Sequence, residues 1–287
     1  MDHATVLRQL IEAPDIVVLP GAHDVLSAKL MEQAGFSAVF TSGFGLAAST
    51  LGMPDVGLLT MTETLDRVKR IVDAVSIPVV ADMDTGYGNP LNVVRTVQEC
   101  VRLGVAGIIL EDQLWPKKCG HMEGKRVIPI EEHGQKIRAA VYAREGNDLV
   151  IIARTDAIAP EGFDEALRRG RAYSAAGADV VFIEAPQRME QLRTVAGAFD
   201  TPVFANMVEG GKTPFLSAQE LERIGFSMVV YPLSGLFAAT RAIQEVAGHL
   251  KKTGTTDGYE QMVSFSEFEK VIGLHDYTNL EARFAVD

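Results

Sequence analysis

The stretch Pro78-Val79-Val80-Ala81-Asp82-Met83-Asp84-Thr85-Gly86 decides the fold of this chain. It begins with a continuous run of apolar residues and ends in acidic and small residues. A run without polar alternation is typical of a strand that is buried on both faces of a parallel sheet. The sequence contains eight such runs, which are Ile16–Pro20, Ala38–Ser42, Pro78–Asp84, Gly107–Asp112, Leu149–Asp156, Val180–Ala185, Pro202–Met207 and Met228–Leu233.

Amphipathic stretches between these runs predict helices. They include Thr62–Val75, Asn89–Leu103, Ile130–Arg144, Phe163–Ala176, Met189–Phe199 and Ala218–Ile224. Gly35, Gly104, Gly177 and Gly225 stand just before an apolar run, where glycine can adopt the left-handed conformation that closes a helix. Eight strand–helix units in 287 residues predict an α/β fold, a single (β/α)₈ TIM-type barrel. A doubly wound open sheet is the rival architecture, because the number of strands does not show closure.

The end of the chain continues beyond the eighth unit. We assign residues 1–254 to the barrel and residues 255–287 to a C-terminal helical extension. An apolar side of this extension is formed by Phe265, Phe268, Val271, Ile272 and Leu274. We therefore expect the extension either to cover the barrel within the same domain or to pack on a neighbouring subunit.

The composition excludes several classes of protein. Hydrophobic residues make up 47% of the chain, and 27 basic residues face 38 acidic ones, for a formal net charge of -11. Such a balance argues against nucleic acid or an anionic membrane as the main partner. No apolar stretch is long enough for a membrane span, no secretory signal is visible, and two cysteines are too few for a disulfide framework. These features predict a cytoplasmic protein.

Acidic residues close two neighbouring strands of the predicted barrel, at the end where barrel enzymes carry their active sites. Asp82 and Asp84 point the same way if the strand alternates through both, and Glu111 ends the next strand. Oxygen ligands from adjacent strands suit Mg²⁺, with Mn²⁺ as the alternative. Asp55, in the loop after the second run, either joins this group through water or is an ordinary turn residue.

Polar residues also close three further strands. Arg154 ends the fifth, where its planar guanidinium suits a substrate carboxylate or an oxyanion, or else merely neutralises the aspartates. Glu184 and Asn206 end the sixth and seventh. Polar groups are costly to bury without a task, and five strands share this feature. The pattern favours a metal-dependent enzyme site.

The segment of residues 113–125, which we call the lid, follows the fourth strand and contains Lys117-Lys118-Cys119-Gly120-His121. Its proline, glycines and only tryptophan indicate a mobile loop that carries a thiol. The two lysines and His121 are expected to lower the pKa of Cys119, so that the thiol acts as acid, base or nucleophile. Cys100, in a predicted helix, is assigned to packing.

Two glycine-containing segments are weaker signals. Gly210-Gly211-Lys212-Thr213 has some likeness to a phosphate loop, but it lacks the first glycine of that motif and is followed by Pro214. Ser42-Gly43-Phe44-Gly45 is interpreted as a loop whose N–H groups and hydroxyl are suited to gripping a substrate carboxylate.

The lid motif and the strand ends together resemble the isocitrate lyase and phosphoenolpyruvate mutase superfamily. The likeness rests on Lys117–His121, Asp82-x-Asp84, Glu111-Asp112-Gln113, Arg154-Thr155-Asp156 and Asn206, which occur in the superfamily's order. It is strongest to the short branch that includes 2,3-dimethylmalate lyase, 2-methylisocitrate lyase and carboxyphosphonoenolpyruvate mutase. This resemblance implies a (β/α)₈ barrel, Mg²⁺, and a homotetramer whose last helices swap between subunits.

The same resemblance implies roles for individual residues. Asp82, Asp84 and Glu111 belong to the metal shell, and Cys119 is the proton donor. The remaining residues implied to surround the substrate are Ser42, Gly43, Phe44, Gly120, His121, Arg154, Glu184 and Asn206. The general base stays unassigned, with Asp55 and a metal-bound water as the candidates.

One departure from the family pattern bears on the substrate. Methylisocitrate lyases carry an arginine after the eighth strand, where this chain has Phe237. An apolar ring suits a methyl group and leaves an extra carboxylate unpaired. We therefore expect a carbon–carbon lyase of a 2-alkyl- or 2,3-dialkylmalate, a small 2-hydroxy acid that it cleaves to pyruvate or a related 2-oxo acid. The alternatives are 2-methylisocitrate or isocitrate cleavage, carbon–phosphorus chemistry, and a non-catalytic barrel that binds a dicarboxylate.

Overall fold

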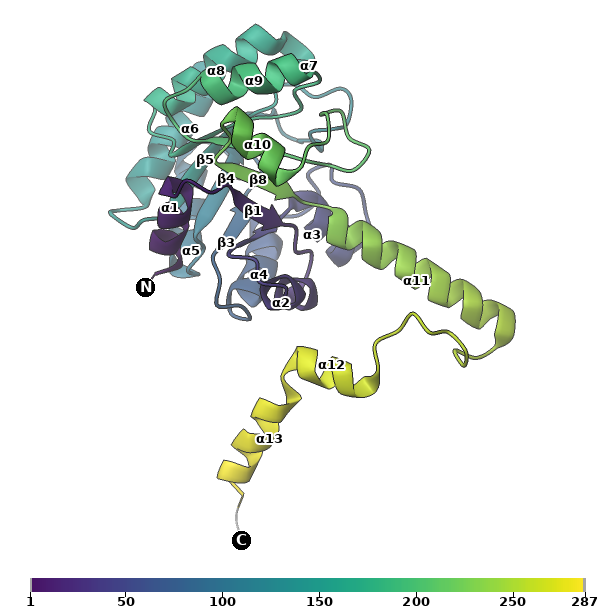
Figure 1. Ribbon diagram of the computed structural model, residues 1–287. Helices are drawn as coiled ribbons and strands as arrows, with labels where there is room; N and C mark the ends of the chain where they lie inside the picture. Colours follow the sequence, from purple (N-terminus) through teal and green to yellow (C-terminus); the bar gives the residue numbers. More distant parts are fainter. Residues whose placement is uncertain (1, 286–287) are drawn as a thin grey trace. The chain divides into compact units, whose positions relative to one another are not determined.

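A computed structural model describes residues 2–285 of the chain and contains an eight-stranded parallel sheet (Figure 1). The strands are β1 (Val17–Pro20), β2 (Val39–Thr41), β3 (Val79–Asp82), β4 (Gly107–Glu111), β5 (Val150–Thr155), β6 (Val180–Ile183), β7 (Val203–Asn206) and β8 (Met228–Tyr231). From β2 to β8 each strand pairs with the next one along the chain, and β8 pairs with β1, whereas β1 and β2 share no ladder of paired residues. At the remaining seam, Ala22 N–H donates to the carbonyl of Phe40 over 2.7 Å. The strands form a nearly closed barrel, so the predicted (β/α)₈ fold is confirmed and the open sheet is excluded.

Helices connect the strands much as the sequence predicts. The helices of the barrel are α1 (His3–Glu12), α2 (Val25–Gln33), α3 (Gly43–Leu51), α4 (Met61–Val72), α5 (Pro90–Arg102), α6 (Ile130–Ala143), α7 (Ile158–Glu161), α8 (Phe163–Ala175), α9 (Met189–Gly197) and α10 (Ala218–Ile224). Side-chain caps begin several of them, such as Thr60 with Glu63 at α4 and Asn89 at α5. The four glycines expected to end helices all have positive φ, between 75° and 105°.

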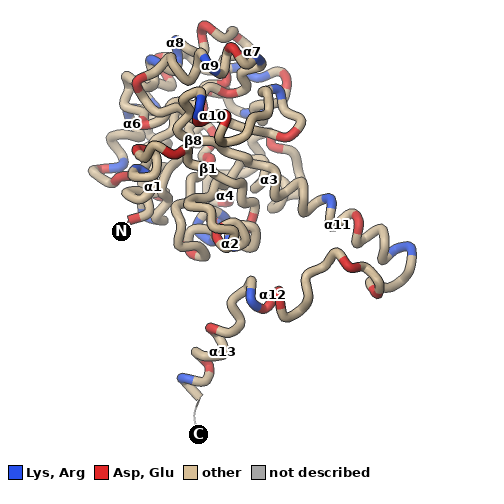
Figure 2. Tube along the Cα trace, viewed as in Figure 1, with Lys and Arg blue, Asp and Glu red and all other residues tan. Residues whose placement is uncertain are grey.

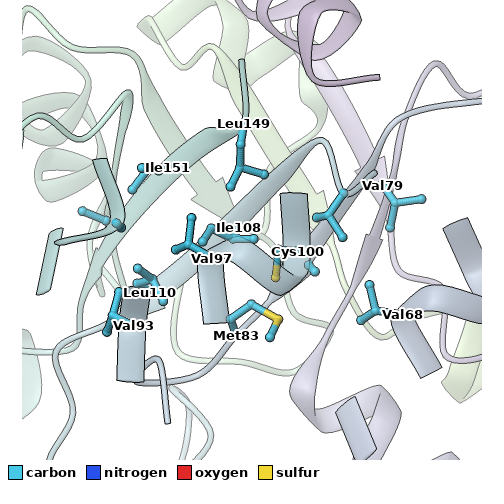
Figure 3. Packing of buried hydrophobic residues seen from close by; sticks show 14 of the residues in the cluster. Val68, Val79, Met83, Val93, Val97, Cys100, Ile108, Leu110, Leu149 and Ile151 are labelled. Atoms are coloured by element: carbon cyan, nitrogen blue, oxygen red, sulfur yellow. The ribbon is translucent and has the colours of Figure 1, made fainter. Parts of the chain in front are cut away.

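Alternate residues of each strand pack into two different apolar layers. Val80 and Ile109 belong to the layer inside the barrel, together with Leu7 of α1. Ile108 and Leu110 belong to the layer between the sheet and the surrounding helices. Figure 3 shows this outer layer, in which Cys100 lies among the side chains of α5 and the strands. The assignment of Cys100 to packing is therefore confirmed.

The described residues divide into two compact units, residues 2–236 and residues 237–285. This division lies earlier than residue 254, where the sequence analysis ends the barrel. The second unit contains most of α11 (Ser234–Thr253), together with α12 (Phe265–Ile272) and α13 (Leu274–Arg283). None of the described residues of these three helices is buried. Across residues 2–285, no helix is long and apolar enough to cross a membrane.

Charged residues of both signs lie on the outer helices. In the view of Figure 2, Lys and Arg are interspersed with Asp and Glu along these helices. Buried charges form a different population, because most of them lie on or just after the C-terminal ends of the strands, among them Asp82, Glu111 and Arg154. The fold therefore gathers its unusual charges at one end of the barrel.

Candidate active site

A cavity opens at the C-terminal ends of the strands and collects most of the predicted site residues. Its lining consists of Phe40, Ser42, Phe44, Asp55, Asp82, Glu111, Lys117, Lys118, Cys119, Gly120, His121, Arg154, Phe182, Asn206, Val208, Val230, Pro232 and Leu233. Four predicted residues do not line it. Asp84 and Gly43 lie beside Asp82, Glu184 lies beside Arg154, and Phe237 belongs to the second unit.

Four carboxylates, which we call the acidic wall, lie on one side of the cavity: Asp55, Asp82, Asp84 and Glu111. Strand β3 stops at Asp82, and Asp84 has a φ of 49°, so strand alternation does not extend to Asp84 as the sequence analysis assumes. Instead, Asp84 N–H donates to Asp82 Oδ1 over 3.0 Å, and the other oxygen of Asp82 accepts from Gly43 N–H at 3.1 Å. A tight turn therefore brings the two carboxylates together. The turn requires a left-handed backbone conformation at Asp84, which aspartate tolerates better than most residues.

Lys117 reaches from the lid into this acidic wall. Its Nζ lies 2.5 Å from Asp55 Oδ1 and 2.8 Å from Asp84 Oδ1, and only 3% of its side chain is exposed. A β-carbon on Gly43 would lie 3.0 Å from Lys117 Nζ and 3.1 Å from Asp84 Oδ1, so glycine leaves room for this ion pair. Lys117 thus pairs with the carboxylates of the acidic wall, a contact that the sequence analysis does not predict.

The acidic wall has more negative than positive charge. Burial, together with Asp82 and Asp55, raises the pKa of Asp84 to about 7 even though Lys117 opposes the shift. Burial also raises the pKa of Glu111 well above its usual range, against the effect of Arg154. Glu111 Oε1 is buried and accepts no hydrogen bond from any described residue. Lys117 and Arg154 do not balance the charge of these carboxylates, and a divalent ion with oxygen ligands fits them.

The predicted metal ligands do not form a ready-made cage. Within residues 2–285, no three His, Cys, Asp or Glu side chains form a metal-holding group. Asp84 pairs with Lys117, whereas Asp82 and Glu111 face the cavity. This arrangement suits Mg²⁺, which keeps several of its waters and is commonly held by one or two direct carboxylates.

Arg154 lies beside Glu111, as its register partner on the adjacent strand β5. Its Nε and Nη2 donate to the two oxygens of Asp156 over 2.8 and 3.1 Å, and its Nε lies 3.4 Å from Glu111 Oε2. The guanidinium also lies over the ring of Phe182, 5.2 Å from its centroid. Although burial opposes the shift, Arg154 and Lys125 hold the pKa of Asp156 below its usual range. A fixed guanidinium at this place is suited to a substrate carboxylate or an oxyanion.

Asn206 and His121 both approach the carboxylate of Glu184 beside Arg154. Asn206 Nδ2 donates to both oxygens of Glu184, at 3.3 and 3.2 Å. His121 Nδ1 accepts from the backbone N–H of Lys212 at 3.0 Å, so its proton is on Nε2, which lies 3.1 Å from Glu184 Oε1. The Gly211-Lys212 segment, which the sequence analysis leaves without a role, therefore orients a histidine of the lid.

Cys119 lies on the inner side of the lid. The base of the lid is closed by Leu114 N–H, which donates to the carbonyl of Arg126 over 2.8 Å, and Cys119 N–H donates to the carbonyl of Asp55 over 3.2 Å. Burial raises the pKa of Cys119 to about 11, and Asp55 adds to this shift. The prediction that Lys117, Lys118 and His121 lower the pKa of Cys119 is wrong, because burial raises this pKa overall and the side chain of Lys117 points into the acidic wall. Cys119 is therefore a protonated thiol, suited to donating a proton.

The segment after β2 is a helix rather than the predicted loop. Ser42 Oγ accepts from Gly45 N–H at 2.9 Å and caps α3, which begins at Gly43. Gly43 N–H already donates a hydrogen bond to Asp82, so the N–H groups of this segment are not all available to a substrate. Ser42 and Phe44 line the cavity, as expected.

Known proteins resemble this chain over nearly its whole length. A family model described as phosphoenolpyruvate phosphomutase matches residues 7–251. A 2,3-dimethylmalate lyase of Eubacterium barkeri is 47% identical, and the match covers 99% of each chain. A 2-methylisocitrate lyase of Bacillus subtilis is 43% identical over 97% of this chain and 92% of that relative.

Solved structures of related proteins have the same fold. Oxaloacetate acetylhydrolase with the inhibitor 3,3-difluorooxalacetate has a TM-score of 0.94 at 36% identity, covering 98% of this chain and 96% of its own. A trigonal crystal form of 2,3-dimethylmalate lyase has a TM-score of 0.93 at 37% identity, covering 100% and 99%. Phosphonopyruvate hydrolase, in a complex with oxalate and Mg²⁺, has a TM-score of 0.90 at 32% identity, with 99% of each chain covered.

Proposed function

This chain belongs to the phosphoenolpyruvate mutase and isocitrate lyase superfamily, and we propose that it is a Mg²⁺-dependent carbon–carbon lyase of 2-alkyl- or 2,3-dialkylmalates. From 2,3-dimethylmalate, the products are pyruvate and propanoate. The observation that carries the proposal is the dual character of the cavity. Acids and a guanidinium share it with apolar side chains, which are Phe40, Phe44, Phe182, Val208, Val230 and Leu233. Such a lining suits a dicarboxylate that carries alkyl groups.

Asp82, Asp84 and Glu111 would hold Mg²⁺, partly through water, because Lys117 and Arg154 do not balance the charge of the acidic wall. A bound Mg²⁺ supplies charge neutralisation at the substrate's carboxylate and at the oxygen of the forming carbonyl. Mn²⁺ is the alternative ion for the same oxygen ligands.

The reaction begins at the C2 hydroxyl of the substrate. Asp55, which lines the cavity with Lys117 Nζ 2.5 Å from its carboxylate, takes the hydroxyl proton. The electron pair of the C2–C3 bond then passes to C3, whose neighbouring carboxylate accepts the charge, and C2 becomes the carbonyl of the 2-oxo acid. Arg154 stabilises the oxygen charge that develops, because Asp156 holds its guanidinium in place beforehand.

Cys119 completes the reaction by protonating C3. Burial keeps the pKa of this thiol raised to about 11, so it carries the proton that the carbanion requires. The closed lid limits the access of water to the carbanion. After the products leave, the proton held by Asp55 passes through solvent to the thiolate, and the site returns to its starting state.

A substrate panel with Mg²⁺ tests the proposal through the release of 2-oxo acid. We expect 2,3-dimethylmalate to exceed 2-methylisocitrate by at least about tenfold in kcat/KM. Among the described residues, Arg154 is the one arginine that lines the cavity, so the third carboxylate of 2-methylisocitrate lacks a second guanidinium. In the family pattern, the arginine that holds this third carboxylate stands at the position of Phe237. Phe237→Arg is therefore the matched variant, and we expect it to reduce the preference for 2,3-dimethylmalate over 2-methylisocitrate.

Other outcomes of the same panel contradict the proposal. Preference for 2-methylisocitrate assigns the chain to the tricarboxylate lyases, and a new phosphorus signal in ³¹P NMR with a phosphonate substrate assigns it to carbon–phosphorus chemistry. Oxalate binding without turnover of any 2-hydroxy acid identifies a non-catalytic barrel.

We also propose a homotetramer whose extension packs on a partner subunit. In support, the second unit exposes large apolar side chains, and Phe265, Tyr277 and Phe284 are 81%, 70% and 70% exposed. Light scattering on the purified protein is expected to give four times the mass of the 31.1-kDa chain, and a monomer contradicts this assembly.

A further inference from the structure

The lid contains a buried lysine to which neither the sequence analysis nor the proposed reaction assigns a role. Lys125 lies between Gly124 and Arg126, which are both exposed, yet only 1% of its own side chain is exposed. An ammonium group is costly to bury unless it is paired and hydrogen-bonded. The partners of Lys125 therefore explain why this part of the loop turns inward.

Lys125 joins the lid to Asp156, the residue that directly follows β5. Its Nζ donates to Asp156 Oδ1 over 2.9 Å and also to the carbonyl of Gly120. Gly120 in turn packs against Arg154 and Glu184, because a β-carbon on it would lie 2.5 Å from both Arg154 Nη2 and Glu184 Oε1. The ammonium of Lys125 thus holds Gly120, the residue after Cys119, against the guanidinium of Arg154.

The same carboxylate also holds Arg154. Asp156 accepts two hydrogen bonds from that guanidinium and one from Lys125, and it is fully buried. Its own position is fixed by Asp112, which accepts from Asp156 N–H over 2.9 Å. Asp112 accepts further bonds from Thr155 Oγ1, Arg169 Nη1 and Tyr173 Oη at 2.7, 3.0 and 2.8 Å. The carboxylate of Asp156 is a rigid anchor.

We propose that Lys125 and Asp156 are positioning residues: one carboxylate holds both the substrate-binding guanidinium and the lid, so that lid closure and Arg154 placement share a single anchor. The role in catalysis rests on the proposed function, whereas the anchoring of the lid does not. Lys125→Met removes the lid contact and leaves Arg154 paired. Asp156→Asn weakens both contacts.

The rate of iodoacetamide alkylation at Cys119, followed by peptide mass spectrometry on the full-length protein with Mg²⁺, measures lid opening directly. Cys100 is fully buried in the outer core layer, so its labelling in the same sample reports global opening. We expect Lys125→Met to raise Cys119 labelling by at least about tenfold while Cys100 labelling is unchanged, because an open lid exposes the thiol. Lys125→Arg, which keeps the charge, is expected to restore most of the protection.

Lys118→Met is the matched control, because it removes a positive charge from the same loop. Lys118 Nζ donates to the carbonyl of Glu123, within the lid itself, and we expect its variant to label at the wild-type rate. The double variant Lys125→Met with Asp156→Asn should label no faster than the faster single variant, since both remove the same bond. Wild-type labelling of Cys119 in Lys125→Met, or a parallel rise at Cys100, overturns the proposal.

Steady-state kinetics distinguish the contact of Asp156 with Lys125 from its contact with Arg154. Lys125→Met is expected to lower kcat by at least about tenfold with little change in KM, because Cys119 loses its position while Arg154 stays paired. Asp156→Asn is expected to lower kcat and also to raise KM by about tenfold. Equal kinetic effects of the two variants contradict the shared anchor. If no 2-oxo acid is released by the wild type, the proposed function fails, and the labelling experiment still decides whether Lys125 holds the lid.

Discussion

Glu111 and Asp156 are two buried carboxylates on adjacent strand ends, and both face Arg154. Glu111 is the last residue of β4, and Asp156 directly follows β5. Arg154 Nε lies 3.4 Å from the nearer oxygen of Glu111 but only 2.8 Å from that of Asp156. Burial acts on both groups, yet the pKa of Glu111 is well above its usual range and that of Asp156 is below it.

The two carboxylates differ in the number of cations that touch them. Asp156 contacts Arg154 bidentately and Lys125 as well, whereas Glu111 has one distant guanidinium and a second oxygen without a hydrogen bond from any described residue. Burial alone therefore does not identify a ligand site. A carboxylate whose charge is already balanced by fixed side chains belongs to the scaffold, and one that lacks such balance is suited to bind an ion.

Glu111→Gln tests the unbalanced side of this comparison and has the largest expected effect. We expect Mg²⁺ affinity to fall by at least about a hundredfold and turnover by at least about a thousandfold, or about 4 kcal/mol of barrier. Without metal, the free energy of unfolding should stay unchanged or rise, because the amide is cheaper to bury than the carboxylate. Isothermal titration, steady-state kinetics and urea unfolding measure the three quantities.

A surface variant provides the control for Glu111→Gln. Glu131 is exposed on α6, and Glu131→Gln is expected to leave both Mg²⁺ affinity and turnover unchanged. Wild-type Mg²⁺ affinity in Glu111→Gln contradicts the assignment of Glu111 to the metal shell.

Asp156→Asn tests the balanced side, where stability should change most. The amide leaves Arg154 and Lys125 buried without a counter-charge, and we expect a loss of about 3–5 kcal/mol in the free energy of unfolding at neutral pH. Because the folded-state pKa of Asp156 lies below the ordinary 3.8, the wild-type advantage is complete above that pH and declines as the pH falls below it. Urea unfolding at neutral and acidic pH measures the difference. A loss below about 1 kcal/mol contradicts the scaffold role.

The sequence predicted the strand ends more completely than the contacts between them. Asp82, Glu111 and Arg154 were predicted together because parallel strands bring their C-terminal ends to one rim. The role of Asp156 was missed because Lys125 is 31 residues away and meets it only after the lid has folded. Similarly, proximity along the chain placed the charge of Lys117 near Cys119, but tertiary contacts direct it to Asp55 and Asp84.

The fold itself was predictable because the apolar runs are continuous and a helical stretch separates each one from the next. Strand alternation failed at one point, Asp84, because a left-handed turn replaces the strand after Asp82. Helix α3 was predicted as a loop because its first turn contains two glycines, Gly43 and Gly45, which have low helix propensity. The cap provided by Ser42 and packing in the core outweigh that propensity.

The two cysteines extend the comparison from carboxylates to thiols. Cys119 lines the cavity, and Cys100 lies in the outer core layer. We expect Cys119→Ala to lose at least about a hundredfold in kcat while it retains Mg²⁺ and oxalate binding, because a positioned acid is removed. Cys100→Ala, the matched control, should cost about 1 kcal/mol of stability and leave kcat unchanged. Nearly full activity of Cys119→Ala removes the thiol from the mechanism.

His133 sharpens the comparison on the scaffold side with the smallest expected effect. Its ring is buried against Tyr173, with centroids 4.5 Å apart, and burial, helped by Lys136 and Arg169, lowers its pKa from 6.5 to about 3. Between these pH values the unfolded chain binds a proton that the folded chain does not, so stability falls as the pH falls. From pH 7.5 to 5.5, we expect the wild type to lose about 1.4 kcal/mol more than His133→Leu in urea unfolding. Parallel losses in the two proteins would mean that the scaffold accommodates a protonated His133, and that its charges are less rigidly balanced than the contacts of Asp156 indicate.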